Sequence, residues 1–185
     1  MTTPFDDLTA ATAPLAAQPL LARTRDVFGF VPNLAVAMAP VPAALEGYLH
    51  ILRAFADTPL DPIEQQVVLM AVSRANGADY SLAVHAALAA KVGAAPDLVK
   101  AVATGGAIAD GRLAALRRFA EALTVNRGHV PPYEVENFCA AGYDRAAIVA
   151  VAFGLGLKTF ANSLAHLAAT PVDAAFASTF ADLLR

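Results

Sequence analysis

Ser81 and His85 are the residues in this sequence best suited to chemistry, and they lie four positions apart. On a helix, residues at i and i+4 share one face, so a serine hydroxyl there can reach an imidazole. An imidazole with an ordinary pKa of about 6.5 exchanges protons near neutral pH. A serine nucleophile also needs an orienting carboxylate and an oxyanion hole, and neither is recognisable beside this pair. The alternative interpretation is a first-turn serine followed by a partly buried, hydrogen-bonded histidine.

The segment around this pair runs Asn76-Gly77-Ala78-Asp79-Tyr80-Ser81-Leu82-Ala83-Val84-His85. It resembles the active-site segment of the alkylhydroperoxidase D and carboxymuconolactone decarboxylase superfamily, whose peroxidase branch reads Asn-x-Cys-x-x-Cys-x-x-x-His. Further segments that fit the family in the same order are 28–33, 42–49, 127–130 and 159–166. The resemblance covers almost the whole chain and looks closest to uncharacterised peroxidase-related members. It implies an all-helical fold and a peroxiredoxin-like family activity.

The redox groups that this resemblance implies are replaced. In the redox members two cysteines are reactive because a helix N-terminus favours the thiolate. The resemblance places them on Ala78 and Ser81, which cannot form a disulfide, and the family's relay glutamate on Gln66, a neutral amide. Only His85 matches. With this degenerate Cys-x-x-Cys motif, we predict that dithiol peroxidase activity is lost.

The decarboxylase branch of the family suggests a second chemistry. It uses no cysteine pair and relies on acid–base chemistry around a histidine, whose position again falls on His85. That branch's neighbouring histidine and glutamate fall on Tyr80 and Ser81, so true carboxymuconolactone decarboxylation is not expected. A small carboxylate or lactone is the implied substrate class. Asn162 and His166, another i, i+4 pair, are predicted to line the same pocket or to hydrogen-bond across an interface.

Other polar residues receive structural interpretations. Glu64 lies about 200° around a helix from Gln66, so we interpret it as a capping residue and not as a replacement for the relay glutamate. Lys158 is expected to be solvated or snorkelling; the alternative is that it supplies a cationic group for an anionic ligand. The chain's one cysteine, Cys139, lies near a predicted helix end and is expected to be buried and inert. We expect no metal and no cofactor, because the histidines are dispersed: His50, His85, His129 and His166.

The elements that must position these residues are helices. Apolar residues recur at helical spacing throughout, which predicts a single all-α domain over 1–185 with roughly seven to nine helices. A helix should begin at Asp61-Pro62-Ile63-Glu64, a capping box with proline at its first position, and end near Ala75. Asp79 is predicted to cap the next helix, Tyr80 to Val92. Further helices are predicted over 14–28, 41–57, 95–104, 110–127, 132–141 and 144–169, the last at the centre of the fold.

The composition limits the classes of partner. The net charge is -3, and lysines and arginines are scattered singly, so no nucleic acid is expected to bind. The longest apolar stretch, Ala146 to Leu157, is shorter than the roughly 20 residues that span a bilayer. The N-terminus shows no signal-peptide pattern, so we expect a cytoplasmic protein that does not contact membranes. Because 57% of the residues are hydrophobic, we expect a homo-oligomer: a dimer, trimer or hexamer.

Two functions remain open from the sequence. The first is a cysteine-independent acid–base enzyme, with His85 as the base and Tyr80, Ser81, Asn162 or His166 positioning the substrate. The second is a catalytically silent, oligomeric binding protein that keeps the family pocket. A pocket with convergent polar groups near His85 favours the first, and a pocket filled by side chains favours the second.

Overall fold

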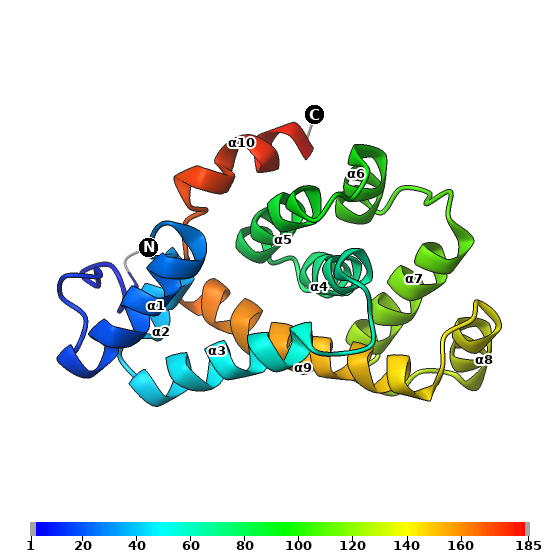
Figure 1. The fold of residues 1–185 in the computed structure, drawn as a ribbon, viewed down its shortest axis with the longest axis horizontal. Coiled ribbons are helices and arrows are strands. Elements are labelled where there is room, and N and C mark those ends of the chain that lie inside the picture. The colour runs from blue at the N-terminus through cyan, green and yellow to red at the C-terminus, as the bar shows by residue number, and fades with distance from the viewer. Residues whose placement is uncertain (1–2, 184–185) are drawn as a thin grey trace.

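Every regular element in the computed structural model, which describes residues 3–183, is a helix (Figure 1). In chain order these are a short 3-10 helix η1 (Leu15–Ala17) and the α-helices α1 (Gln18–Phe28), α2 (Asn33–Met38), α3 (Pro42–Ala56), α4 (Pro62–Ala75), α5 (Asp79–Lys91), α6 (Pro96–Thr104), α7 (Gly111–Val125), α8 (Pro132–Ala140), α9 (Arg145–Leu167) and α10 (Ala174–Leu183). The all-α prediction is confirmed, but a count of seven to nine helices is too low. α2 has under two turns, too few to show a repeat, and α10 follows Pro171, where we predicted no helix.

The start of α4 confirms the predicted capping box. The Asp61 carboxylate accepts hydrogen bonds from the amides of Ile63 and Glu64, both at 2.8 Å, and the Glu64 carboxylate accepts one from the Asp61 amide at 3.0 Å. The predicted cap of α5 is wrong by one residue. Ala78 is the N-cap there, because its carbonyl already accepts the Leu82 amide, and Asp79 is the first helical residue. Asp79 still places a negative charge at the positive end of the helix.

The centre of the fold is α4, not α9 as we predicted. α4 packs against α3, α5, α6, α7 and α9, and nine consecutive or near-consecutive residues between Glu64 and Ser73 are buried. α9 lies along one side of this bundle (Figure 1). Among residues 3–183, α9 is the one helix that is long and apolar enough to cross a membrane. Inside this fold, 44% of its most apolar stretch is buried. α9 therefore has one packed face and one exposed apolar face.

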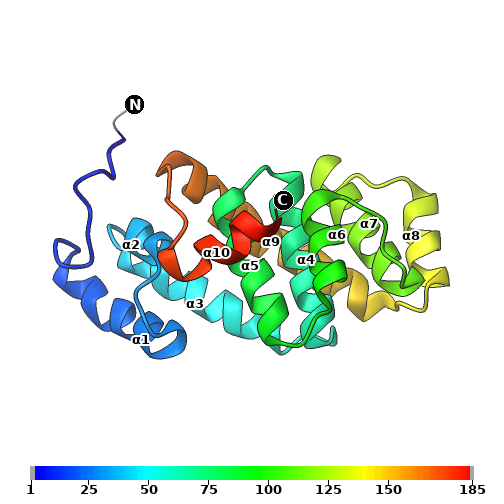
Figure 2. The same ribbon diagram turned by 90° about the horizontal axis from the view of Figure 1, so that it is seen from above.

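The hydrophobic core consists of two clusters. The larger cluster surrounds α4 and includes Val68, Leu116, Phe119, Phe138 and Val151. The smaller cluster joins α1, α2, the start of α3 and the end of α9, and includes Leu21, Leu34, Met38, Leu45, Tyr80 and Ala161. The side chain of Tyr48 packs against both clusters. α10 lies across α5 and closes the other side (Figure 2). α5 is therefore enclosed between α4, α9 and α10.

Candidate functional site

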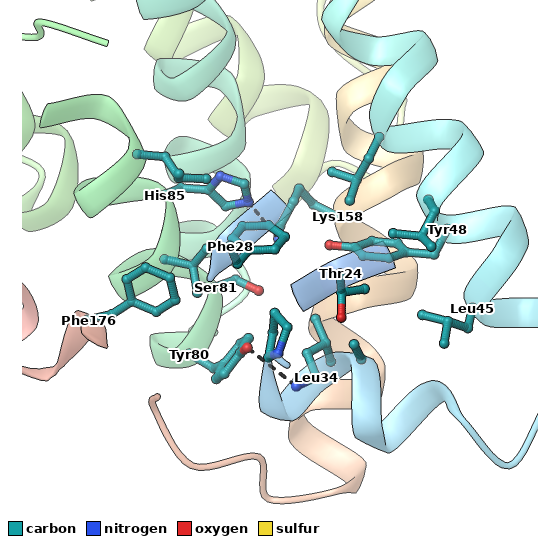
Figure 3. A pocket seen from close by; sticks show the side chains of 16 residues that line it. Thr24, Phe28, Leu34, Leu45, Tyr48, Tyr80, Ser81, His85, Lys158 and Phe176 are labelled. Carbon is teal, nitrogen blue, oxygen red and sulfur yellow. Dashed lines mark hydrogen bonds between the residues drawn. The ribbon is translucent and has the colours of Figure 1, made fainter. Parts of the chain in front are cut away.

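A small cavity lies where the two clusters meet, with α5 on one side and α3 and α9 on the other (Figure 3). Its volume is about 60 Å³, enough for a molecule of a few heavy atoms. The wall is mostly apolar and includes Phe28, Leu34, Leu45, Val84, Leu88 and Phe176. The polar side chains that reach it are those of Thr24, Tyr48, Tyr80, Ser81, His85 and Lys158. Three of the predicted site residues, Tyr80, Ser81 and His85, thus lie together on this wall.

His85 is held between α4 and α9 by both ring nitrogens. Its Nδ1 lies 3.0 Å from Gln66 Oε1. Its Nε2 lies 3.1 Å from Lys158 Nζ, a contact that Figure 3 shows. An amide oxygen can only accept, so Nδ1 carries the ring hydrogen. In a neutral imidazole the other nitrogen then has a free lone pair, which accepts a hydrogen bond from the Lys158 amine. Gln66 therefore fixes the tautomer of His85, and His85 orients Lys158.

Burial controls the charge of this pair. His85 is 4% exposed, and burial, followed by the charge of Lys158, holds its pKa well below the ordinary value. Lys158 is 1% exposed, and burial lowers its pKa to about 7. Among residues 3–183 no carboxylate forms an ion pair with this amine. At neutral pH the histidine is therefore neutral, and the lysine is the group that changes protonation.

Two hydroxyl groups complete the polar part of the cavity. Ser81 is 1% exposed, and its Oγ is buried with no hydrogen-bond partner. This hydroxyl is therefore available to hydrogen-bond with a molecule in the cavity. Tyr48 points its hydroxyl into the cavity from α3 (Figure 3), and burial raises its pKa, so the group stays protonated. Both side chains can donate a hydrogen bond to a bound oxygen atom.

The remaining predicted ligand-binding residues do not all converge on this cavity. Tyr80 lines it, but its hydroxyl donates to Asp173 at 2.7 Å and accepts from the Leu34 amide at 3.3 Å. Asn162 is 1% exposed, and its amide is buried without a hydrogen-bond partner, outside the cavity wall. His166 is exposed on the surface, where its Nε2 lies 3.1 Å from the Asn76 carbonyl oxygen. Asn162 and His166 are not hydrogen-bonded to each other.

Of the residues that we interpreted as structural, some lie as predicted and others do not. Glu64 caps α4 as predicted, and it also pairs with Arg112 at 3.0 Å and accepts a hydrogen bond from Tyr143 at 2.9 Å. Cys139 is exposed on α8, so the expectation of a buried thiol is wrong; nine residues in a helix present only part of its circumference to the core. Ala78 is buried at the start of α5. Within the described residues 3–183, no three His, Cys, Asp or Glu side chains converge as a metal site requires.

Lys158 is the functional candidate that sequence reasoning undervalued. The expectation of a solvated or snorkelling lysine is wrong, because the amine is buried against His85. The helical register contains the missing signal. Gly154, Lys158, Ala161 and Ala165 recur at spacings of three or four and lie on the packed face of α9. A lysine in register with the small buried residues of an apolar helix is placed in the interior.

Comparison with known proteins identifies a matching family and a shared fold. Residues 39–123 match the carboxymuconolactone decarboxylase family, a stretch that includes Gln66, Ser81 and His85. No curated protein matches the sequence. The debrominase Bmp8, in a cysteine-to-alanine variant bound to 2,3,4-tribromopyrrole, has a similar fold: TM-score 0.83, 19% identity, covering 99% of this chain and 98% of that one.

Two uncharacterised peroxidase-related proteins have the same architecture. The protein from Silicibacter sp. TM1040 gives a TM-score of 0.82 at 22% identity, covering 97% of this chain and 99% of that one. The protein from Ralstonia eutropha JMP134, an alkylhydroperoxidase AhpD core, gives 0.80 at 21% identity, with 91% and 90% covered. At such identities these likenesses establish the shared fold. The family match over residues 39–123, together with these structures, supports a relationship to the carboxymuconolactone decarboxylase and alkylhydroperoxidase D-like superfamily.

Proposed function

We propose that this protein is a cysteine-independent acid–base enzyme that acts on a small, largely apolar carboxylate or lactone. The observation that carries the proposal is the contact between Lys158 Nζ and His85 Nε2, at 3.1 Å, on the wall of an apolar cavity. An acid–base catalyst is most effective when its pKa is close to the working pH. The pKa of Lys158, about 7, meets this condition, whereas that of His85 lies well below it. Lys158 therefore replaces His85 as our candidate for the proton-exchanging group.

The surrounding residues supply the other roles of such a site. A protonated Lys158 pairs with a substrate carboxylate, and a neutral Lys158 takes a proton from a substrate or from water that attacks a lactone. His85 accepts a hydrogen bond from the amine in either state, and Ser81 and Tyr48 offer hydroxyl groups to the substrate oxygen. A structural neighbour holds 2,3,4-tribromopyrrole, a small ring compound. This supports a small organic molecule as the ligand of the fold.

Calorimetric titration with butanoate tests the proposal. A carboxylate beside Lys158 favours the ammonium form, so binding at about pH 8 should take up close to one proton per site. Proton uptake is measured by repeating the titration in buffers with different ionisation enthalpies. Lys158→Met should abolish it, and Lys100→Met, at an exposed lysine on α6, should leave it unchanged. Binding of butanoate without proton uptake would exclude Lys158 as its partner.

Turnover separates the enzyme from the second candidate, a silent binding protein. That candidate is favoured by one observation: both nitrogens of His85 are already hydrogen-bonded, so the ring has no free position for a substrate. An enzyme should open γ-butyrolactone or a related small lactone with a rate that rises through about pH 7, and Lys158→Met should remove this dependence. A protein that binds butanoate with proton uptake yet opens no lactone and exchanges no substrate hydrogen is a binding protein.

A further inference from the structure

We propose that Lys158 is a carbonyl-binding lysine, which forms an imine with small aliphatic aldehydes that enter the cavity. This inference rests on the proposed function, since it needs the same cavity and the same amine, and it specifies the chemical class of the ligand. Three observations of the site support it: the direction of the amine, the unused hydroxyl of Ser81 and the apolar wall.

The amine is oriented for attack. Lys158 donates one hydrogen to His85 Nε2, and its side chain lines the cavity (Figure 3). Because Gln66 Oε1 accepts from Nδ1, Nε2 is kept as an acceptor, which can also receive a proton released during the reaction. A neutral lysine amine in an apolar pocket is an effective nucleophile towards carbonyl compounds. The arrangement holds such an amine with its lone pair available to a ligand.

The oxygen of an aldehyde also finds a partner. Ser81 Oγ is buried and unpartnered, and it shares a helical face with His85, one turn away. It can donate a hydrogen bond to the carbonyl oxygen as that oxygen gains charge. The rest of the wall is apolar, and the cavity volume of about 60 Å³ suits a chain of a few carbons. Loss of water from the adduct is favoured in a site that excludes water.

The reaction balances without an oxidant or reductant. The lone pair of Nζ attacks the carbonyl carbon, a C–N bond forms, and the C=O π bond opens to an alkoxide. The nitrogen passes one proton to His85 Nε2, which returns it to the alkoxide oxygen to give a carbinolamine. The second nitrogen proton takes the same route to that oxygen, which leaves as water while the C=N bond forms. One amine and one aldehyde thus give one imine and one water molecule.

Reductive trapping on the wild-type protein tests this inference. The chain has three lysines, and Lys91 and Lys100 are exposed, so they serve as internal references. Butanal and sodium cyanoborohydride are added at about pH 7, and peptide mass spectrometry follows the reduced butyl adduct at each lysine. Ordinary exposed lysines are protonated at this pH, so Lys158 should be modified at least about tenfold faster than either reference. Butanoate should slow only the reaction at Lys158.

The outcomes separate this inference from the proposed function. A Lys158 that reacts no faster than Lys100, in a protein that still binds butanoate with proton uptake, would overturn the imine and leave the acid–base proposal standing. Fast trapping at Lys158, without proton uptake when butanoate is added, would support imine formation and exclude a carboxylate as the ligand of Lys158. Ser81→Ala should slow trapping at Lys158 several-fold and leave Lys91 and Lys100 unchanged. An unchanged rate at Lys158 in this variant would remove Ser81 from the reaction.

Discussion

At the scale of single residues, the amide of Gln66, at the position where the family resemblance implies a glutamate, has a direct electrostatic effect. A carboxylate beside an imidazole stabilises its charged form, whereas an amide oxygen only accepts a hydrogen bond. In this chain Gln66 Oε1 contacts His85 Nδ1, and Lys158 lies on the other nitrogen. The amide therefore allows a neutral histidine to sit beside a lysine that is partly charged. A neutral acceptor and an amine that titrates near neutrality form one unit.

Gln66→Glu should favour the charged form of His85. A carboxylate in place of the amide should raise the pKa of His85 towards or above its ordinary value, because the opposite charge lies within hydrogen-bond distance. The measurement is an NMR titration of the His85 ring, with His166, exposed and bonded to a backbone carbonyl, as the reference. Gln66→Leu, which removes the acceptor, should not raise the pKa. A His85 pKa that stays low in the glutamate variant would contradict the contact.

Lys158 should also make stability depend on pH. Its pKa is about 7 in the folded chain and about 10.4 in an unfolded one, so between these values the unfolded state binds more protons. Stability attributable to this group therefore increases as pH rises, by about 2 kcal/mol between about pH 7 and about pH 9. Urea unfolding at both values should show the gain in the wild type and in Lys100→Met. Lys158→Met should lose it; a gain that persists there would have another origin.

At the scale of helices, the approach of α9 to α3 and α4 depends on one glycine. A Cβ atom at Gly154 would lie 2.9 Å from both Phe55 Cε2 and Val68 Cγ1, closer than normal packing allows. This close approach brings the packed face of α9, with Lys158 one turn later, against the rest of the bundle. Gly156, two residues on, is exposed, and a Cβ there meets nothing within 4 Å. The two glycines therefore serve different purposes.

Alanine substitution should separate them. Gly154→Ala should destabilise the fold by about 1–3 kcal/mol, because overpacking outweighs the gain in helix propensity. Gly156→Ala should stabilise it by about 0.5–1 kcal/mol, since alanine restricts the unfolded chain and nothing opposes it here. Chemical unfolding at matched protein concentration measures both. A stabilised Gly154→Ala variant would mean that α9 is free to move away from α3 and α4.

Some helix boundaries and site residues can be predicted from local sequence, and others depend on tertiary packing. The start of α4 is predictable because Asp61, Pro62 and Glu64 each have a local role that depends on no other part of the chain. The Ser81–His85 pair is also predictable, since it lies within one helix. The partners of His85 come from α4 and α9, 19 and 73 positions away, and no local pattern joins them. Tertiary packing also decides that Lys158 is buried and Cys139 is exposed.

At the scale of the whole molecule, we expect self-association through α9. Three large apolar side chains remain exposed on this helix, Val149 at 64%, Phe160 at 42% and Leu167 at 70%. Their spacings of 11 and 7 residues place them on one stripe. Sedimentation or light scattering should show an oligomer in the wild type that dissociates in Val149→Glu/Leu167→Glu. Val125→Glu, at an exposed residue at the end of α7, is the matched control. A monomeric wild type would rule out this interface.

Peroxide chemistry gives a second test of the whole protein. We expect no peroxide consumption with a dithiol reductant, because Ala78 and Ser81 stand where a cysteine pair is expected and Cys139 is on α8. Turnover above that of a Cys139→Ala control would contradict this. Ala78→Cys/Ser81→Cys places one thiol at the N-cap of α5 and one in its first turn, and the helix N-terminus should lower the pKa of at least one below about 8.5. Thiolate absorbance against pH measures that shift.

The division of the core into two clusters has a consequence for exchange kinetics. The cavity lies at their junction, and the hydrogen bonds from Tyr80 and from the Asn33 amide to Asp173 tie the smaller cluster to the segment before α10. Release of this clasp can open the smaller cluster as a unit while amide hydrogens of α4 stay protected from solvent deuterium. A ligand enclosed beside Lys158 would then leave at the rate of this sub-global opening. Its residence time would then depend on hydrogen bonds to Asp173, a residue outside the cavity wall.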